Sequence, residues 1–302
     1  MTPDALRARV ASLTVWKNGE QRAPHKPLLL LYALARFAAG HERLPFSEVE
    51  PRLVGLLRAF GPARKQYHAS YPFWRLQNDG LWTLDGTGGL VQRASNSDPT
   101  LTSLRQQDPA GHFPTEVAVV LRQHPGLVAE LAETLLDAHF PDSIHEEILD
   151  AVGLDLAALE REAGGGRKRR RRRDPAFRDR VLRAYGYRCA VCAYDGRLGH
   201  ALIGVDAAHV KWHVAYGEDE VTNGLALCAL HHRLLDRGVW TPTPSGIVVV
   251  AEDAHGGEAF EQWMLRYHGA PLASPTSAAY RVAEPNAAWH VREVFKGPAR
   301  PV

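Results

Sequence analysis

The sequence predicts an α+β protein of two domains, the first mainly helical with a small β-hairpin and the second mixed. Three observations support this prediction. The 302 residues exceed the usual length of a single domain. Apolar residues recur at helical spacing through most of the first half, whereas the second half contains short alternating runs between turn residues. A glycine-rich and then strongly basic segment separates the two halves.

The first domain is expected to be mainly helical, because apolar residues at helical spacing recur with a proline or glycine near one end of each segment. Between the third and fourth helices, two short apolar runs flank Asn78-Asp79-Gly80, which predicts a hairpin over residues 73–84. The polar, turn-rich residues 93–108 are expected to form a loop. The predicted helices are Pro3–Leu13, Pro27–Ala39, Phe46–Phe60, Thr115–Gln123, Leu127–Ala138 and Asp142–Val152.

The second domain is expected to begin with a helix that runs to Tyr185, since Asp174 and Pro175 are typical of a helix start. A strand over residues 202–205 leads into the sequence DAAH. The stretch ALCALHHRLLDRG predicts a helix that ends at Gly238. Beyond it we expect strands at 239–241 and 247–250, a short helix at 258–267, and an extended proline- and alanine-rich arm.

The boundary between the domains is predicted from charge as well as from glycine. The chain carries a net charge of +2, but residues 167–173, RKRRRRR, hold seven positive charges, so the rest of the chain carries −5. Three glycines followed by like charges cannot form a packed core, which predicts a solvated linker. We therefore place domains at 1–160 and 175–302, joined by a basic linker at 161–174.

Composition excludes some classes of protein. No stretch is long and apolar enough to span a membrane, and the first residues, MTPDALRARV, lack the apolar core of a signal peptide. The three cysteines gather in one short window, so none is expected in a disulfide. These features predict a cytoplasmic protein that binds no membrane. The sequence leaves homodimer formation open.

Three polar residues, His209, Asn223 and His232, stand in the order that is typical of an HNH nuclease. The spacing, the flanking apolar runs and the nearby cysteines all resemble that motif over roughly residues 174–255. The resemblance implies a ββα fold that grips one divalent metal, and DNA hydrolysis as the activity. It also implies that Asn223 orients the catalytic histidine or the metal-bound groups.

Phosphodiester hydrolysis requires an activated water and a counter-charge for the phosphate. An imidazole titrates near neutral pH, so His209 can accept the proton of water. His232 and Asp236 are four residues apart on a predicted helix and would share one face, where they can hold Mg²⁺, Mn²⁺ or a similar ion. The residue before His209 is Ala208, where many HNH motifs have a metal ligand, and Asp206 on the same strand face is expected to substitute.

The cysteines predict a second, structural metal site. Cys189 and Cys192 form a CxxC pair, and Cys228 is followed three residues later by His231. Four such ligands have the spacing of a closed tetrahedral zinc site. The alternative is three buried free thiols beside surface histidines.

Two segments of the first domain resemble the sulfur-binding domain of type IV, McrA-like restriction enzymes that cut phosphorothioate-modified DNA. They are APHKPLLLL at 23–31 and YPFWRL at 71–76, followed by NDGLW. The same order of binding module, basic linker and HNH domain occurs in those enzymes. The resemblance implies that double-stranded DNA carrying a backbone modification is the partner.

Sulfur is larger, more polarizable and more weakly hydrated than oxygen, so an apolar hollow can accept it where a phosphate oxygen would be rejected. Tyr71 and Pro72 are expected to form that hollow, whereas Phe73 and Trp74 are expected in the core. Basic residues would hold the phosphates and bases. The candidates are His25, Lys26, Arg64, Lys65, His68 and Arg75, together with Arg167, Lys168 and Arg169 of the linker.

Two other functions stay open at this stage. The protein could bind DNA through an HNH domain that is inactive and structural. Alternatively, methylated cytosine could be the recognised mark, in which case Trp74 and Trp82 would contribute to an aromatic cage for a flipped base. The basic tract could also be only a solubilising linker.

Overall fold

The computed structural model describes residues 1–16, 19–92, 98–162 and 175–301. Contacts divide the chain into two compact units, Met1–Lys168 and Arg169–Val302. The predicted linker at 161–174 falls almost wholly outside the described residues, so its exact bounds stay a prediction. No helix in the described ranges combines the length and hydrophobicity needed to cross a membrane.

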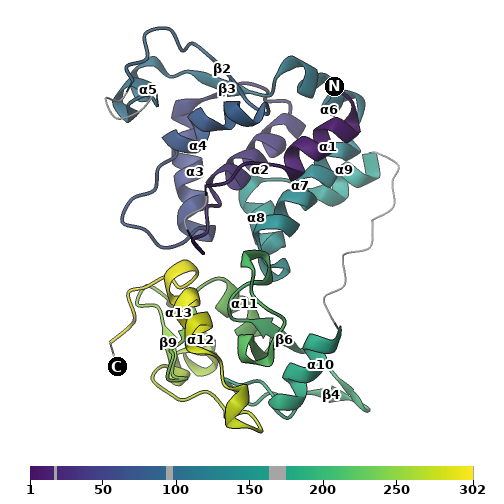
Figure 1. The fold of residues 1–302 in the computed structure, drawn as a ribbon, viewed down its shortest axis with the longest axis vertical. Coiled ribbons are helices and arrows are strands. Elements are labelled where there is room, and N and C mark those ends of the chain that lie inside the picture. Colours follow the sequence, from purple (N-terminus) through teal and green to yellow (C-terminus); the bar gives the residue numbers. More distant parts are fainter. Residues whose placement is uncertain (17–18, 93–97, 163–174, 302) are drawn as a thin grey trace. The chain divides into compact units, whose positions relative to one another are not determined.

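The first unit is organised around helix α2 (His25–Ala38), which contacts α3 (Phe46–Phe60), α4 (Ser70–Arg75), α7 (Gly126–His139) and α8 (His145–Val152) (Figure 1). Its sequence LLLLYALA is apolar on every side, and Leu28 to Leu31 are almost completely buried. A helix that is hydrophobic all round must be covered on all faces. The remaining helices are α1 (Pro3–Ala11), α5 (Leu101–Gln107), α6 (Thr115–Gln123) and α9 (Leu156–Glu162).

A small antiparallel sheet closes one side of this unit. Its strands are β1 (Leu44–Pro45), β2 (Thr83–Asp85) and β3 (Ala110–His112), in the order β1-β3-β2. Gly111 in the central strand lies directly against the Trp82 indole, and a Cβ there would sit 2.0 Å from a ring carbon. Glycine is therefore required at this point for the strand to pass over the tryptophan.

The predicted hairpin over 73–84 is wrong. Tyr71-Pro72-Phe73-Trp74-Arg75 is helical in α4, a 3-10 turn follows at Leu76–Asp79, and Gly80 ends it with φ +65°. Proline is tolerated in the first turn of a helix, and the three-residue spacing of Phe73 and Leu76 buries both side chains on one face. Only Thr83–Asp85 forms a strand, and it pairs with β3 instead of with residues 73–77.

Two other parts of the sequence prediction also differ from the structure. Within the expected loop 93–108, α5 begins at Leu101, where the Thr100 hydroxyl caps the helix by accepting the N–H of Ser103. The expected C-terminal arm contains helix α13 (Glu284–Glu293), whose Trp289 side chain is fully buried. Each of these helices buries an apolar side chain, Leu104 in α5 and Trp289 in α13, and this burial stabilises the helix.

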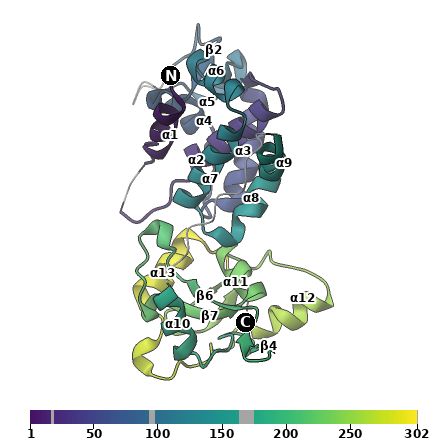
Figure 2. The same ribbon diagram turned by 90° about the vertical axis from the view of Figure 1, so that its right-hand side faces the viewer.

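The second unit contains the ββα arrangement that the HNH resemblance implies (Figure 2). Strand β6 (Val205–His209) pairs antiparallel with β7 (Gly224–Cys228), with His209 opposite Gly224. Helix α11 (Ala229–Asp236) follows β7 directly. Residues 226–228, which the sequence placed in that helix, therefore belong to the strand. The α+β fold class is confirmed.

Helix α10 (Pro175–Ala184) packs on the β6–β7 pair. Its close approach depends on Gly224, where a Cβ would lie 2.4 Å from the Val181 side chain. The other elements are β4 (Arg197–Leu198), β5 (Ala201–Leu202), β8 (Trp240–Pro242), β9 (Val248–Val250) and α12 (Glu258–Trp263).

Candidate functional site

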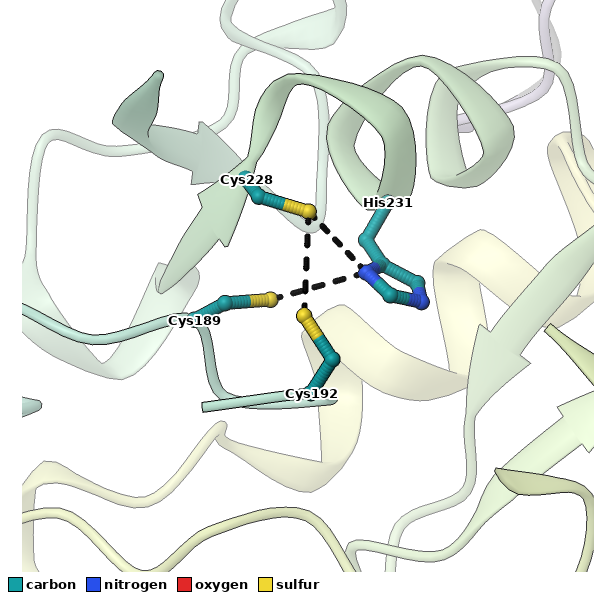
Figure 3. A group of neighbouring side chains, drawn as sticks. All are labelled: Cys189, Cys192, Cys228 and His231. Carbon is teal, nitrogen blue, oxygen red and sulfur yellow. Dashed lines mark hydrogen bonds between the residues drawn. The ribbon is translucent and has the colours of Figure 1, made fainter. Parts of the chain in front are cut away.

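The four predicted zinc ligands converge from three segments (Figure 3). Cys189 and Cys192 come from the turn after α10, Cys228 ends β7, and His231 lies in the first turn of α11. Their donor atoms all lie within 4.8 Å of one another. His231 Nδ1 lies 3.1 Å from the Cys228 Sγ and 3.6 Å from the Cys189 Sγ, and the Cys192 and Cys228 sulfurs are 3.9 Å apart.

This geometry fits one tetrahedral zinc ion. With the usual Zn–S and Zn–N bond lengths, neighbouring ligands stand about 3.5–3.8 Å apart, close to the separations found here. His231 is fully buried and its Nε2 is 2.8 Å from the Trp263 carbonyl, so that nitrogen donates and Nδ1 faces the sulfurs. Hydrogen bonds with Cys192 and Cys228 lower the pKa of the Cys189 thiol, whereas hydrogen bonds with Cys189 and Cys228 raise the pKa of the Cys192 thiol. Neighbouring thiolates repel one another, and a cation between them would remove that repulsion.

His209 stands at the end of β6, where the predicted base should be. Its Nε2 lies 2.7 Å from a carboxylate oxygen of Asp219. The imidazole stacks on the Phe177 ring at a centroid distance of 4.0 Å and an interplanar angle of 15°. The His213 ring is 5.8 Å away. The Asp219 hydrogen bond and the stacked Phe177 ring therefore both help to hold His209 in place.

Asn223 is 1% exposed and its amide holds the loop between β6 and β7. Its Oδ1 accepts the N–H of Lys211 at 2.8 Å, and its Nδ2 donates to the carbonyls of Lys211 and Glu218, each at 3.0 Å. Its main-chain carbonyl accepts the N–H of Val210, next to His209, at 2.9 Å. Asn223 thus acts on the main chain around the histidine.

The two predicted ligands of the catalytic metal lie together on α11. His232 Nε2 is 3.3 Å from a carboxylate oxygen of Asp236, and both side chains are largely buried. Two ligands at right angles around one divalent ion are about 3 Å apart when the bonds are near 2.1 Å, so this pair fits a metal. Within the described ranges, no third His, Cys, Asp or Glu donor joins them to complete a cluster.

The structure does not bring Asp206 to this pair. Its carboxylate accepts from Arg178 Nε at 2.8 Å and from the N–H of Ala207 at 2.9 Å. Arg178 also donates to the carbonyl of Val205 at 3.1 Å. The role of Asp206 as a metal ligand stays a prediction, and it requires that this ion pair open.

A pocket of 260 Å³ opens in the first unit, beside the start of α2 and one face of α4. It brings together five of the predicted DNA-binding residues from two segments about 45 positions apart in the sequence: His25 and Lys26 from one, and Tyr71, Pro72 and Arg75 from the other. Tyr71 and Arg75, four apart on α4, share a face, and the Arg75 guanidinium lies 5.1 Å from the centre of the Tyr71 ring. The pocket is lined by Val15, Trp16, Ala23, His25, Lys26, Tyr71, Pro72 and Arg75.

The pocket combines an apolar wall with two cationic side chains, each of which is paired with a carboxylate. Lys26 Nζ pairs with the buried carboxylate of Asp79 at 2.5 Å, and Arg75 donates to Asp98 at 2.6 Å. Burial lowers the pKa of His25 to about 4, and the nearby charges of His68 and Arg64 contribute less to the same shift. The His25 imidazole is therefore neutral at pH 7. His25 and Lys26, the first two residues of α2, both line the pocket, and a helix start favours anions.

The remaining predicted DNA contacts lie beside the pocket or outside the described residues. The His68 ring packs edge-on against Tyr71 at 5.4 Å. Arg64 and Lys65 are exposed on the loop before α4 and do not line the pocket. Arg167, Lys168 and Arg169 belong to residues that the structure does not describe.

Sequence reasoning missed five residues that the structure assigns to these sites. Trp16, which is 57% exposed, joins the pocket together with Val15 and Ala23. The only sign available in the sequence was a tryptophan a few residues before APHKP. The contacts of His209 with Asp219 and Phe177 could not be predicted from spacing in the sequence, because both partners come from separate segments.

Comparisons with known families match both units. A family described as the ScoMcrA-like DNA sulfur-binding domain matches residues 3–157. A family described as HNH endonuclease matches residues 189–241. Both matches fall where the sequence showed the two resemblances. None of the curated proteins matches the chain.

Several solved structures are similar to parts of the chain. The sulfur-binding domain of ScoMcrA complexed with phosphorothioated DNA is 25% identical, with a TM-score of 0.43, and the match covers 51% of this chain and 96% of that one. The corresponding domain of SprMcrA, also complexed with phosphorothioated DNA, is 24% identical with a TM-score of 0.42, over 53% and 97%. The type IV phosphorothioation-dependent restriction endonuclease ScoMcrA is 25% identical with a TM-score of 0.43, over 60% of this chain but only 38% of its own length.

Proposed function

This chain belongs to the ScoMcrA-like DNA sulfur-binding domain family, and on that premise we propose that it is a modification-dependent restriction endonuclease. Its first unit binds phosphorothioate-modified double-stranded DNA, and its HNH unit hydrolyses nearby phosphodiester bonds with a divalent metal. The observation that carries the proposal is the pocket in which Tyr71 and Pro72 meet His25, Lys26 and Arg75. It joins an apolar wall to cationic side chains on a chain that also carries an HNH domain.

Discrimination of sulfur from oxygen follows from hydration. A phosphate oxygen that enters the hollow at Tyr71 and Pro72 loses water, and it costs on the order of 1–3 kcal/mol if no donor replaces that water. Sulfur loses less because it is weakly hydrated. Lys26, Arg75 and the start of α2 supply charge for the rest of the phosphate group, which both kinds of DNA carry.

Hydrolysis is assigned to the residues around β6 and α11. The proton of an attacking water moves to His209, the water oxygen forms a bond to phosphorus, and the bond from phosphorus to the departing sugar oxygen breaks. That oxygen then takes a proton from solvent. His232 and Asp236 would hold the divalent ion, which, when bound, supplies counter-charge for the phosphate and the leaving oxygen.

One alternative loses support from the position of a side chain. A methylated-base reader needs aromatic rings that can stack on a flipped base, but the Trp82 ring is 2% exposed and packs against Phe73 and Phe113 in the core. Trp74 alone would not make a cage. The alternative of an inactive HNH domain is decided by the cleavage experiment.

The experiment compares cleavage of three duplexes of one sequence, unmodified, phosphorothioate-modified and cytosine-methylated, in Mg²⁺ and in Mn²⁺. We expect cutting of the phosphorothioate duplex alone. His209→Ala should abolish cutting and leave DNA affinity unchanged, whereas His200→Ala, at an exposed histidine of the same unit, should retain both. Absence of cutting by the wild-type protein on all three duplexes, with zinc in place, would favour the inactive domain.

A further inference from the structure

The imidazole of His209 is held on two sides by groups outside its own strand. The Asp219 carboxylate lies 2.7 Å from Nε2, and the Phe177 ring stacks on one face. The His209 side chain is 11% exposed and that of Asp219 is 34% exposed. The contact therefore forms in a partly buried place, where a charged hydrogen bond is worth more than at an open surface.

We infer that Asp219 is a positioning residue that sets the tautomer and orientation of His209 for proton abstraction. The inference rests on the proposed hydrolysis. An ionised carboxylate can only accept hydrogen bonds, so the nitrogen that faces it must carry the proton. A neutral His209 therefore has its proton on Nε2 and its lone pair on Nδ1, and Nδ1 is the atom that can take a proton from water.

The same carboxylate also supports the next state of the histidine. When Nδ1 accepts the water proton, the ring becomes an imidazolium with hydrogen on both nitrogens. Asp219 then faces a full positive charge at 2.7 Å, and its attraction for the ring increases as the proton arrives. Asp219 itself neither gains nor loses a proton, so the proton that leaves water ends on His209.

The loop that carries Asp219 is built to keep it in place. The Asn223 amide joins Lys211 to Glu218, the residue just before Asp219, through three hydrogen bonds. Gly217 makes this closure possible, because a Cβ there would lie 1.9 Å from the Lys211 carbonyl oxygen. Asn223 thus orients the histidine indirectly, through the main chain that ends at Asp219.

Helix α10 contributes to both of these contacts of His209. Phe177 supplies the stacked ring, and Arg180, three residues later and on the same face, donates from Nη2 to the Asp219 main-chain carbonyl at 2.7 Å. One rigid helix therefore fixes the ring plane and the position of the carboxylate together. The position of Asp219 is thus supported both by Arg180 of α10 and by the loop that Asn223 closes, which is more support than an incidental surface ion pair requires.

The test measures the His209 tautomer in the full chain labelled with ¹⁵N-histidine, with His209→Ala used to identify its signals. We expect the wild type to show protonated Nε2 and unprotonated Nδ1 in the neutral state. Asp219→Asn removes the charge at equal size and offers both a donor and an acceptor, so we expect a mixture of tautomers. Asp219→Ala should show the same loss, and Asp195→Asn, which changes an exposed carboxylate paired with Arg188, should show no change.

Single-turnover cleavage of the phosphorothioate duplex supplies the second readout. Asp219→Asn should slow cutting by about 10²–10⁴-fold, the range for loss of assisted proton transfer, with unchanged DNA affinity and zinc content. Asp219→Glu, which restores the carboxylate, should recover part of the rate. An unchanged tautomer, or an unchanged rate in a protein that cuts, would overturn the inference.

The two readouts separate this inference from the proposed function. The tautomer is measured without DNA or divalent metal, so it tests the positioning role even if the wild type cuts no duplex. In that case the proposed function fails on the cleavage experiment, and the role of Asp219 in setting the tautomer stands or falls on the ¹⁵N signals alone. If Asp219→Ala unfolds the unit, Asp219→Asn gives the answer.

Discussion

The His231 imidazole donates from Nε2 to the main-chain carbonyl of Trp263, 2.8 Å away, and so presents Nδ1 to three cysteine sulfurs. The contact ties helix α12 to the zinc ligands. A ligand histidine whose other nitrogen is fixed in this way is held in the correct tautomer and orientation before metal binds. The predicted zinc site therefore connects the turn after α10, the end of β7, α11 and α12.

Loss of a cysteine ligand should release zinc and unfold the second unit, because a structural metal contributes folding free energy directly. We expect Cys189→Ser and Cys228→Ser to lose zinc by elemental analysis and to lose helix signal by circular dichroism. Trp263→Ala is the matched control, since it keeps the carbonyl that His231 uses and removes a side chain that is 49% exposed. Wild-type protein that is folded without zinc would contradict the prediction.

His232→Ala should weaken binding of Mn²⁺ by at least about tenfold, because loss of a ligand costs no less than loss of a supporting contact. Zinc content should not change. A titration followed by calorimetry measures the affinity, and loss of zinc instead would mean that His231 and His232 have exchanged roles. Asp206→Asn decides whether the carboxylate now paired with Arg178 also joins the ion, since only a ligand would lower the affinity as His232→Ala does.

Tyr71→Ala should remove most of the preference for phosphorothioate over ordinary DNA, about 5- to 150-fold for 1–3 kcal/mol. Weak binding to both duplexes should persist. Tyr71→Phe keeps the ring and should keep the preference. Lys26→Ala should lower both affinities and leave their ratio unchanged, with folding checked because Asp79 loses its partner. The measurement is a pair of dissociation constants per variant, and equal wild-type constants would refute sulfur recognition.

Replacement of residues 167–173 by a neutral segment of equal length should reduce affinity for every duplex about equally. Up to seven phosphate contacts would be lost, so the slope of log affinity against log salt should become shallower by as much as about 6. Binding titrations at several salt concentrations measure this slope. A loss confined to modified DNA would make the tract a specificity element, and no loss would make it only a linker.

Acid should destabilise the first unit through His25. Its pKa is about 4 in the folded protein and 6.5 in the ordinary state, so between these values the unfolded chain binds a proton that the folded chain does not. The free energy of unfolding therefore falls as pH decreases from 6.5 to 4. Urea unfolding across this window should show a shallower fall for His25→Gln. Burial also lowers the pKa of His139 to about 4, so His139→Gln should likewise make the fall in unfolding free energy shallower. If the fall is as steep in both variants as in the wild type, these histidines are not the cause of the acid destabilisation.

Much of the fold could be predicted from local pattern alone. Thr115–Gln123 and Phe46–Phe60 are helices over the bounds that the sequence predicted, because amphipathic spacing over many residues has one simple solution. The prediction of a strand at residues 73–77 was wrong because a short apolar run is consistent with the two-residue period of a strand and with the 3.6-residue period of a helix. Burial of Phe73 and Leu76 favours the helix, and Phe73 packs edge-on against Phe46, which belongs to a different helix.

The candidate sites divide in the same way. The amino-acid sequence by itself predicted the cluster of three cysteines with His231 and the order His209, Asn223, His232, because metal and nucleophile chemistry demand those residue types at short, recognisable spacings. Only the tertiary structure decided that Asp219 faces His209, that Asp206 pairs with Arg178, and that Trp16 joins Tyr71 in one pocket. These contacts join segments with no fixed spacing, so their formation depends on how helices and strands pack, and packing is a property of the whole chain.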